Sequence, residues 1–463
     1  MHDNDRISLF NRFVGRMAWL VFWAIMGSIS LVLRFYYRFV SRARKPAESS
    51  VKPLKVAFCE NGAGYGGAII SLAAFLEKIP DEFEPFIYTS LGSDDYKQLS
   101  RLGKWRHTPP VGLLDRAVLK KLGLPLASFL DNLFNLLPYA FSYFVAFRRD
   151  GIGCVYLNND ASCNFAAAIA AKFARLPLVL HARGFNADTS GNRWVLSKLD
   201  HCIAVSTAVQ AELLTLGVPP LKCSVIPEGL DLTVFHPKSL SNSVRDELKL
   251  PEDSAVITLV GGLVDWKGQD VLLDAAPLIF QQFPNAVILL IGAAYGKSSD
   301  FANMIIERAK SPVMQSRVYM LGARNDIADI LACSDVVVHA STKPEPFGRT
   351  FLEGMALGKA VIASNEGGPL DVISDRVDGI LIEPRSPSKL ADAINLLLRD
   401  PAFSAKLGQN AAEEAKNYSI ESHAHSISAV LQMVCGGIGP GLAPEIAVPG
   451  TKINFPPQPH NQN

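Results

Sequence analysis

Short apolar runs that end at glycine-containing or polar turns and lead into helical patterns recur along most of this chain. One series begins at residues 54–59 and continues through 153–159, 176–180 and 202–206, and a second series begins at residues 255–260. The second series continues through 286–291, 318–321 and 335–340. A strand, a turn and a helix form the unit of a parallel sheet that carries helices on its faces. The repeat therefore predicts an α/β protein with two such domains.

The length and composition agree with that prediction. At 463 residues the chain exceeds what one hydrophobic core supports. With 49% hydrophobic residues, 19% charged residues and a net charge of +1, it is nearly neutral, which argues against nucleic acid held by bulk charge. The seven cysteines form no Cys-x-x-Cys pair and no zinc-like cluster with histidine. We expect reduced thiols in a cytosol-facing protein, and no metal site.

Residues 1–50 differ from the rest and predict a membrane anchor with a basic linker. Met17 to Leu33 is an uncharged apolar run between Arg16 and Arg34. As a helix it reaches about 25 Å, close to the roughly 30 Å of a hydrocarbon core. A spanning anchor, a helix lying in the membrane interface and a soluble packing helix all fit this run. The basic cluster from Arg34 to Lys45 places the following domains on the cytoplasmic face of the membrane.

A second apolar concentration runs from Leu122 to Phe147 and is interrupted by Pro125, Asp131 and Pro138. These interruptions argue against a membrane span. A helical hairpin that lines a groove or docks on a membrane fits the pattern. Two buried helices of an α/β domain fit it equally well.

Two carboxylates flank a predicted helix start in residues 343–353. Pro344 and Pro346 exclude helix around Glu345 and hold the chain extended there, while Glu353 lies one to two turns into the following helix. Open α/β sheets bind ligands at the carboxyl ends of their strands, and helix N-termini favour phosphate. The stretch fits a sugar nucleotide, with one carboxylate near the phosphates and one set back for hydroxyl groups. A plain loop with ordinary N-terminal helix charge is the alternative.

Three further positions suit a phosphate-bearing ligand. The strand 54–59 is followed by a glycine loop that includes Gly66 and Gly67, although its spacing is not that of a dinucleotide-binding loop. His181 ends a predicted strand just before Gly184, where it either touches a ligand or serves the structure. Lys267 stands in the glycine-flanked turn 261–268 before a predicted helix.

With these residues assembled, the chain resembles the retaining glycosyltransferases of family 4 (glycosyl transferases group 1), which have the GT-B fold. Glu345 to Glu353 is similar to the Glu-x7-Glu motif of that family, and supporting similarities lie at 225–231, 261–268 and 367–371. The resemblance covers about residues 54–434 and implies two Rossmann-like domains that face a cleft. The predicted parts are an anchor and linker (1–50), an N-terminal acceptor domain (54–235), a linker (236–253), a C-terminal nucleotide-sugar domain (254–410), a crossover helix (411–435) and a disordered tail (436–463).

The resemblance also implies roles for individual residues. Glu345 and His181 match catalytic positions beside the transferred sugar, Glu353 the ribose-binding glutamate, and Lys267 the lysine on the diphosphate. The other donor-binding positions that it implies are Gly66, Gly67, Phe347, Gly348, Arg349, Thr350, Ala323 and Arg324.

One departure concerns the diphosphate. Glycine stands at position 262, where the family usually has arginine, and we expect Arg349, Arg324 or Arg183 to replace its charge. Losing a charge-assisted contact to phosphate weakens a site by roughly 1.5–3 kcal/mol.

The resemblance implies transfer of a sugar, with retention at the anomeric carbon, from a nucleoside diphosphate donor. No cofactor is expected and, because no Asp-x-Asp motif ends a strand, no metal. The apolar segments favour a saccharide or lipid-linked saccharide acceptor and assembly of a cell-surface polysaccharide or glycolipid. A nucleotide-sugar epimerase and a non-catalytic nucleotide-sugar-binding scaffold are the alternatives.

Overall fold

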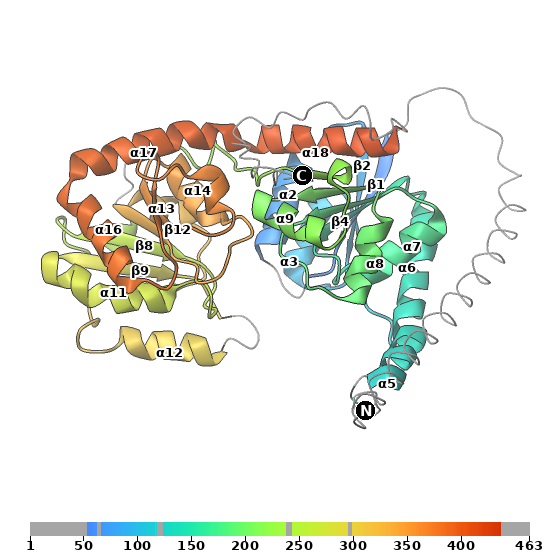
Figure 1. The fold of residues 1–463 in the computed structure, drawn as a ribbon, viewed down its shortest axis with the longest axis horizontal. Coiled ribbons are helices and arrows are strands. Elements are labelled where there is room, and N and C mark those ends of the chain that lie inside the picture. The colour runs from blue at the N-terminus through green and yellow to red at the C-terminus, as the bar shows by residue number, and fades with distance from the viewer. Residues whose placement is uncertain are drawn as a thin grey trace, which may run out of the picture.

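The structure is a computed structural model that describes residues 53–62, 66–115, 117, 124–237, 243–294 and 299–436. Within these residues the chain forms two parallel β-sheets, each flanked by helices, and two long helices run along one edge of both domains (Figure 1). The prediction of two α/β domains with parallel sheets is confirmed.

The N-terminal sheet has the strand order β3-β2-β1-β4-β5-β6-β7. Its strands are β1 (Leu54–Glu60), β2 (Phe83–Thr89), β3 (Lys104–His107), β4 (Cys154–Asn159), β5 (Leu178–Ala182), β6 (His201–Ala204) and β7 (Cys223–Val225). The longer helices of this domain are α2 (Gly67–Glu77), α6 (Leu137–Asp150), α7 (Phe165–Ala174), α8 (Ser190–Lys198) and α9 (Thr207–Thr215), and shorter ones are α3 (Asp94–Lys97) and α5 (Leu124–Asp131).

The C-terminal sheet has the order β10-β9-β8-β11-β12-β13. Its strands are β8 (Ala255–Val260), β9 (Ala286–Ile291), β10 (Val318–Gly322), β11 (Val336–His339), β12 (Ala360–Ser364) and β13 (Ile380–Ile382). Its helices are α10 (Ser243–Glu247), α11 (Gln269–Gln282), α12 (Ser299–Ala309), α13 (Ile327–Ala332), α14 (Arg349–Ala356), α15 (Pro369–Val372), α16 (Pro387–Arg399) and α17 (Pro401–Ala415).

The central strands of both sheets are buried along nearly their whole length. Every residue of β5, β9, β11 and β12 is buried, as the continuous apolar runs of the sequence require when helices cover both faces. Because all strands of a sheet run parallel, their carboxyl ends meet at one edge. Polar residues that follow different strands are therefore brought together there.

The last helices connect the two domains. Helix α17 packs against α14 and β12 of the C-terminal domain, whereas α18 (Ile420–Cys435) packs against α2 of the N-terminal domain. In Figure 1 they lie nearly end to end above both domains. The backbone N–H of Ile420 donates to the Leu230 carbonyl (2.9 Å), so the two passages of the chain between the domains are paired.

The segment 122–147 was predicted to be either a helical hairpin or two buried helices. Its described residues belong to a single helical run, so the hairpin hypothesis is wrong. Helix α5 continues through a π-helical segment, η2 (Asn132–Leu136), directly into α6. Pro138 has no N–H to donate to the Phe134 carbonyl four residues earlier, and the N–H of Leu113 donates to that carbonyl instead (3.1 Å). Proline thus marks an irregular turn rather than a reversal of the chain, as π-helical insertions often do.

The predictions for residues 1–50 and 437–463 lie outside the described residues. Within the part of the chain that the structure describes, no helix is both long and apolar enough to cross a membrane.

Candidate functional site

Glu345 is the centre of a buried polar cluster at the carboxyl end of β11. The Nζ atom of Lys267 donates to both carboxylate oxygens, at 2.8 and 2.9 Å, and Ser341 Oγ donates to Oε2 at 2.8 Å. The Nε2 atom of His339 lies 3.4 Å from Oε2. Burial by itself would raise the pKa of the Glu345 carboxyl, but Lys267 and His339 together outweigh burial and hold that pKa well below its usual range. Glu345 is therefore a carboxylate.

The loop that carries Glu345 rests directly on the turn after β12. The backbone N–H of Gly368 donates to the Glu345 carbonyl at 2.8 Å. Gly367 has φ +75°, and a Cβ there would stand 2.1 Å from the same carbonyl oxygen. Only glycine permits both the left-handed backbone and this approach, so the 367–368 turn fixes the position of the carboxylate.

A second glycine brings Lys267 to Glu345. Gly268 precedes α11 with φ +79°, and a Cβ there would meet the Ala340 carbonyl oxygen at 1.9 Å. The turn before α11 therefore lies against the end of β11. The Lys267 Nζ atom also lies 4.1 Å from the centre of the Trp266 ring, a cation–π distance. The side chain of Lys267 is 21% exposed, whereas that of Glu345 is 8% exposed.

Glu353 lies in the second turn of α14, below the same loop. Its side chain is buried, and burial raises the pKa of its carboxyl. The positive charge of Arg349 lowers this pKa in part but does not cancel the effect of burial. The Nε atom of Arg349 is 3.7 Å from Glu353 Oε1. Arg349 begins α14 directly after Gly348, whose φ of +97° directs the chain into the helix.

His181 lies within β5 and is fully buried. The Tyr156 hydroxyl is hydrogen-bonded to its Nδ1, while its Nε2 has no partner among the described residues. Burial is the main reason that the pKa of this imidazole lies well below its usual value, and the nearby Arg183 and His423 lower it further. His181 is therefore a neutral ring at neutral pH.

Next to His181, the carboxyl ends of the N-terminal strands hold a buried ion pair that the sequence did not predict. The Nη1 atom of Arg183 donates to both oxygens of Glu228 (2.6 and 2.7 Å) and to Ser71 Oγ (2.7 Å), and its Nε donates to Asn158 (2.7 Å). Burial alone would raise the pKa of the Glu228 carboxyl, but nearby positive charge, chiefly that of Arg183, lowers this pKa to about 2. The only available signal was that polar residues follow β4, β5 and β7.

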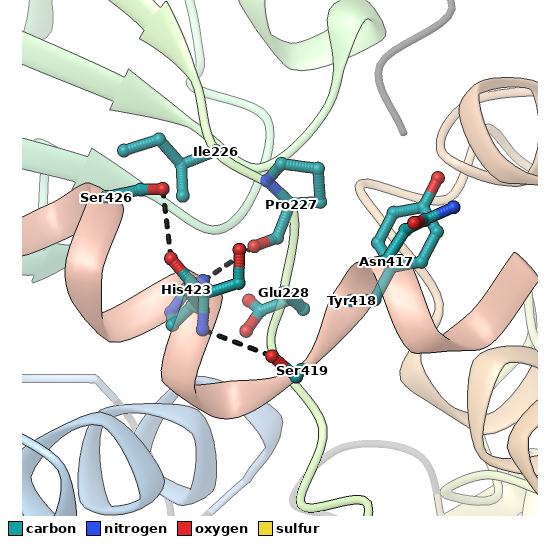
Figure 2. Close-up of a pocket in the computed structure, with 9 residues that line it drawn as sticks. Ile226, Pro227, Glu228, Asn417, Tyr418, Ser419, His423 and Ser426 are labelled. Carbon is teal, nitrogen blue, oxygen red and sulfur yellow. Dashed lines mark hydrogen bonds between the residues drawn. The ribbon is translucent and has the colours of Figure 1, made fainter. Parts of the chain in front are cut away.

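The chain segments that pass between the domains adjoin this ion pair. The loop after β7 and the start of α18 enclose a cavity of about 10 Å³, large enough for about one water molecule (Figure 2). In it the Nδ1–H of His423 donates to the Pro227 carbonyl at 2.6 Å. The cavity is lined by Ile226, Pro227, Glu228, Asn417, Tyr418, Ser419, Ser422, His423 and Ser426.

The other predicted positions are dispersed. Gly66 precedes α2, and nothing lies within 4 Å of the place where its Cβ would stand; Gly67 is the first residue of that helix. Phe347 is buried against Phe351, with the ring centres 5.9 Å apart, whereas Thr350 is half-buried. After β10, Ala323 is exposed and Arg324 forms ion pairs with Glu247 and Asp326.

Two contacts join the domains near these clusters. The backbone N–H of Thr207, at the start of α9, donates to the Asp371 carboxylate of α15 at 2.7 Å. The Nη1 atom of Arg349 reaches the Gly229 carbonyl at 3.5 Å. Among the described residues, no group of three or more histidine, cysteine, aspartate or glutamate side chains is arranged to hold a metal ion.

Two family models match the chain, one in each domain. Glycosyltransferase Family 4 matches residues 83–234, and Glycosyl transferases group 1 matches residues 241–414. A D-inositol 3-phosphate glycosyltransferase of Rhodococcus opacus is 30% identical over 242 residues, which is 51% of this chain and 54% of that protein. The corresponding protein of Salinispora arenicola is 28% identical over 262 residues, 54% and 58% of the two chains. The chain spans little more than half the length of these curated relatives.

Solved structures establish the fold. The Anabaena HepE protein, crystallised in complex with UDP and glucose, has a TM-score of 0.71 and 24% identity over 82% of this chain and 99% of its own. A glycosyltransferase from Rickettsia africae has a TM-score of 0.69 and 20% identity, over 82% and 98% of the two chains. Both alignments extend over nearly the whole of the known structure, so the pair of parallel-sheet domains is a shared architecture.

Proposed function

Because this chain belongs to the GT-B-fold glycosyltransferases of family 4 (glycosyl transferases group 1), we propose that it transfers a sugar from a nucleoside diphosphate donor to a saccharide or lipid-linked saccharide acceptor. We further propose that the anomeric configuration is retained. The observation that carries this proposal is the joint placement of Lys267, Glu345 and Glu353 around the β11–α14 loop.

In this proposal the Lys267–Glu345 pair changes partners when the donor binds. The ammonium group contacts Glu345 in the structure and would turn to the diphosphate, because the Lys267 side chain is flexible and partly exposed. Glu345 would then accept hydrogen bonds from the sugar hydroxyls, and the buried Glu353 those of the ribose. The carboxylate of Glu345 would also stabilise positive charge that develops at the anomeric carbon.

The proposed chemistry needs no strong base. The bond from the anomeric carbon to the leaving phosphate breaks, and the bond to the acceptor oxygen forms on the same face. The leaving phosphate takes the proton of the acceptor hydroxyl, while Lys267 balances the negative charge that develops on it. We expect His181, whose Nε2 is unpaired, to contact the sugar or leaving group as a neutral ring.

The acceptor side of the proposal rests on an apolar surface on the helical run formed by α5, η2 and α6. Phe134, Phe141 and Val145 are 37%, 49% and 42% exposed, and spacings of seven and four residues place them on one face of the helical run. Three more exposed side chains from the same region complete what we call the α5–α6 apolar surface, namely Leu113, Leu114 and Leu126. Large exposed apolar patches of soluble domains mark interaction sites.

We propose that this surface rests on the cytoplasmic face of a membrane and so brings a lipid-linked acceptor to the N-terminal domain. The exposed Arg148 and Arg149 at the end of α6 suit anionic lipid headgroups. The apolar run 17–33 and the basic cluster 34–45 of the sequence support the same location. A role in surface polysaccharide or glycolipid assembly follows from such an acceptor.

Vesicle flotation of the full chain tests this location. The double variant Phe134→Ser, Phe141→Ser should bind anionic vesicles less than the unmodified protein does. The control variant Leu221→Ser, at an exposed position of the same domain, should bind them as well as the unmodified protein. Equal binding of all three proteins would remove the α5–α6 apolar surface from the proposal.

An activity screen tests the proposed reaction. The purified protein is incubated with several nucleoside diphosphate sugars, UDP sugars first, and with lipid-linked saccharides or D-inositol 3-phosphate as acceptor. We expect release of nucleoside diphosphate that depends on an acceptor and is unchanged by EDTA. A product formed without acceptor would indicate an epimerase instead, and a protein that binds no nucleoside diphosphate would refute the proposal.

The glycine at position 262 favours one other candidate, a non-catalytic nucleotide-sugar-binding scaffold. Glu345→Ala separates the two, because an enzyme should lose turnover while it keeps nucleotide binding. A scaffold would show no turnover in the unmodified protein either.

A further inference from the structure

The proposed function assigns one cation of the described residues to the diphosphate, whereas a diphosphate presents two charged groups. Lys267 is that cation, and position 262, in the same turn, contributes no side chain. On the basis of the proposed function, we infer that Arg349 supplies the second positive charge to the leaving diphosphate. Arg349 would act as a donor-binding residue that stabilises the charge developing during transfer.

The position of Arg349 in the chain supports this assignment. It is four residues after Glu345 and four before Glu353, so its side chain originates between the two carboxylates of the proposed site. It is also the first residue of α14, where free backbone N–H groups and the helix dipole favour an anion. A guanidinium can add two parallel hydrogen bonds to a phosphate there.

The present contacts of Arg349 leave its guanidinium available. Within the described residues, its contacts are a 3.5 Å approach to the Gly229 carbonyl and a 3.7 Å approach to Glu353. Both exceed the roughly 2.7–2.9 Å of a strong charge-assisted hydrogen bond. The side chain is 19% exposed, so it is shielded from bulk water without being enclosed. A phosphate could therefore engage it without breaking a strong contact.

The two other arginines suggested by the sequence are already occupied. Arg324 holds Asp326 at 2.6 and 2.8 Å and Glu247 at 2.7 and 2.9 Å. Arg183 is committed to the buried carboxylate of Glu228 in the other domain, and only its Nη2 lacks a partner among the described residues. Recruiting either would leave a carboxylate unpaired, which for the buried Glu228 is costly.

One lysine nearby is a rival. Lys343 is two residues before Glu345, is 55% exposed and lies 3.6 Å from Asp265. Its ion pair with Asp265 is weak because both side chains are exposed. Lys343 serves as the matched comparison, because removing either Lys343 or Arg349 removes one positive charge within a few residues of Glu345.

The test compares ligands that differ by one phosphate group. We measure the affinity of the full chain for UDP, UMP and the active donor, together with kcat/KM, in Arg349→Ala, Arg349→Lys and Lys343→Ala. Arg349→Ala should weaken UDP binding about 10- to 100-fold, the range expected for a lost charge-assisted contact, and lower kcat/KM at least as much. UMP binding should change less than twofold, because UMP carries the ribose but not the second phosphate. Lys343→Ala should behave like the unmodified protein.

A restored arginine provides the positive control. Gly262→Arg, added to Arg349→Ala, should recover at least tenfold in UDP affinity, whereas Gly262→Ala should recover nothing. Arg349→Lys should be intermediate, because it keeps the charge but loses the paired hydrogen bonds.

The contrary results are distinct. Unchanged UDP affinity in Arg349→Ala, or a loss in Lys343→Ala instead, would overturn the assignment. Equal weakening of UDP and UMP would show that Arg349 only supports Glu353 or the fold. If Arg349→Ala does not fold, Arg349→Gln and Arg349→Lys are compared in the same way. An unmodified protein that binds neither nucleotide would refute the proposed function itself.

Discussion

An ion pair with a buried carboxylate lies at the carboxyl ends of the strands in each domain, and these two pairs, Arg183–Glu228 and Lys267–Glu345, differ in how firmly they are held. In the N-terminal domain the Arg183 side chain is 2% exposed and donates to Glu228, Ser71 and Asn158. In the C-terminal domain Lys267 is 21% exposed and lies over the Trp266 ring.

The difference separates a structural pair from one that can open. A planar guanidinium with several short hydrogen bonds cannot leave its site without exposing a buried carboxylate to an apolar surrounding. A lysine on a flexible stem can exchange one oxygen partner for another. We expect mutations of the first pair to change the free energy of unfolding, and mutations of the second to change activity.

The largest effect should follow Arg183→Ala. It leaves Glu228 buried without its cation, and breaking a buried pair lowers the free energy of unfolding by about 3–5 kcal/mol. Denaturant unfolding followed by circular dichroism measures this. As a control, Arg183→Met combined with Glu228→Leu should recover most of the loss, because apolar replacement removes both buried charges. A loss below about 1 kcal/mol in the single variant would mean that the pair is not structural.

Lys267→Ala should act mainly on catalysis. If Lys267 carries the leaving-group charge, kcat should fall by about 10²–10³-fold, the range for removing one preorganised stabilising group. Its loss of unfolding free energy should be smaller than that of Arg183→Ala, because Ser341 and His339 remain beside Glu345. Steady-state kinetics with the active donor, and the same unfolding experiment, give both values. A variant as unstable as Arg183→Ala with intact kcat would reverse the comparison.

The N-terminal cluster should also impose a pH dependence on stability. Burial lowers the pKa of His423 to about 4, from an ordinary value of 6.5. Between these values the unfolded chain binds a proton that the folded chain excludes, so stability is lost as the pH falls from 6.5 to 4. Each such group contributes about 1.4 kcal/mol per pH unit.

Replacing His423 by asparagine should reduce that slope by about one proton equivalent, measured as unfolding free energy at several pH values. Burial also lowers the pKa of His201 to about 4. The contribution of His201 to the slope should therefore persist in His423→Asn and be lost in His201→Asn. An unchanged slope in His423→Asn would show that its ring is accessible to protons in the folded state.

The smallest effect should come from one of the contacts that join the domains, between Thr207 and Asp371. Thr207→Val removes the hydroxyl that, with the backbone N–H of the same residue, contacts Asp371. The free energy of unfolding should fall by about 1 kcal/mol, as for one ordinary hydrogen bond. Calorimetry should show a small shift of the unfolding temperature to a lower value, and kcat should be unchanged. A larger shift would mean that this contact holds the domains together.

The sequence predicted the fold well because the fold depends on local repetition. Continuous apolar runs bounded by glycine identified most strands of both sheets, and Pro344 and Pro346 placed Glu345 outside a helix. For residues 122–147 the sequence pattern did not decide between a hairpin and two buried helices. In the structure Pro138 is accommodated within one helical run by a π-helical segment and by the N–H of Leu113.

The site was predicted only where its residues are close in sequence. Glu345 and Glu353 share one loop and helix, so their spacing was informative. The pairing of Arg183 with Glu228 depends on which strands are neighbours and on how deeply both side chains are buried, and neither follows from the sequence pattern. The short approach of Lys267 to Glu345 likewise depends on Gly268, whose backbone angle is a property of the fold.

The position of α18 has a consequence for the order in which this protein is made. The core of the N-terminal domain, around Ile69 and Phe75, includes Ala424, Ile427, Val430 and Leu431 from the end of the chain. A domain ordinarily folds as the ribosome releases it, the N-terminal one first. Here the domain that is synthesised first acquires the last part of its core only after the whole C-terminal domain has emerged. Nascent chains stalled before Ile420 should therefore be cut readily in the first domain by a protease, and full-length chains should not.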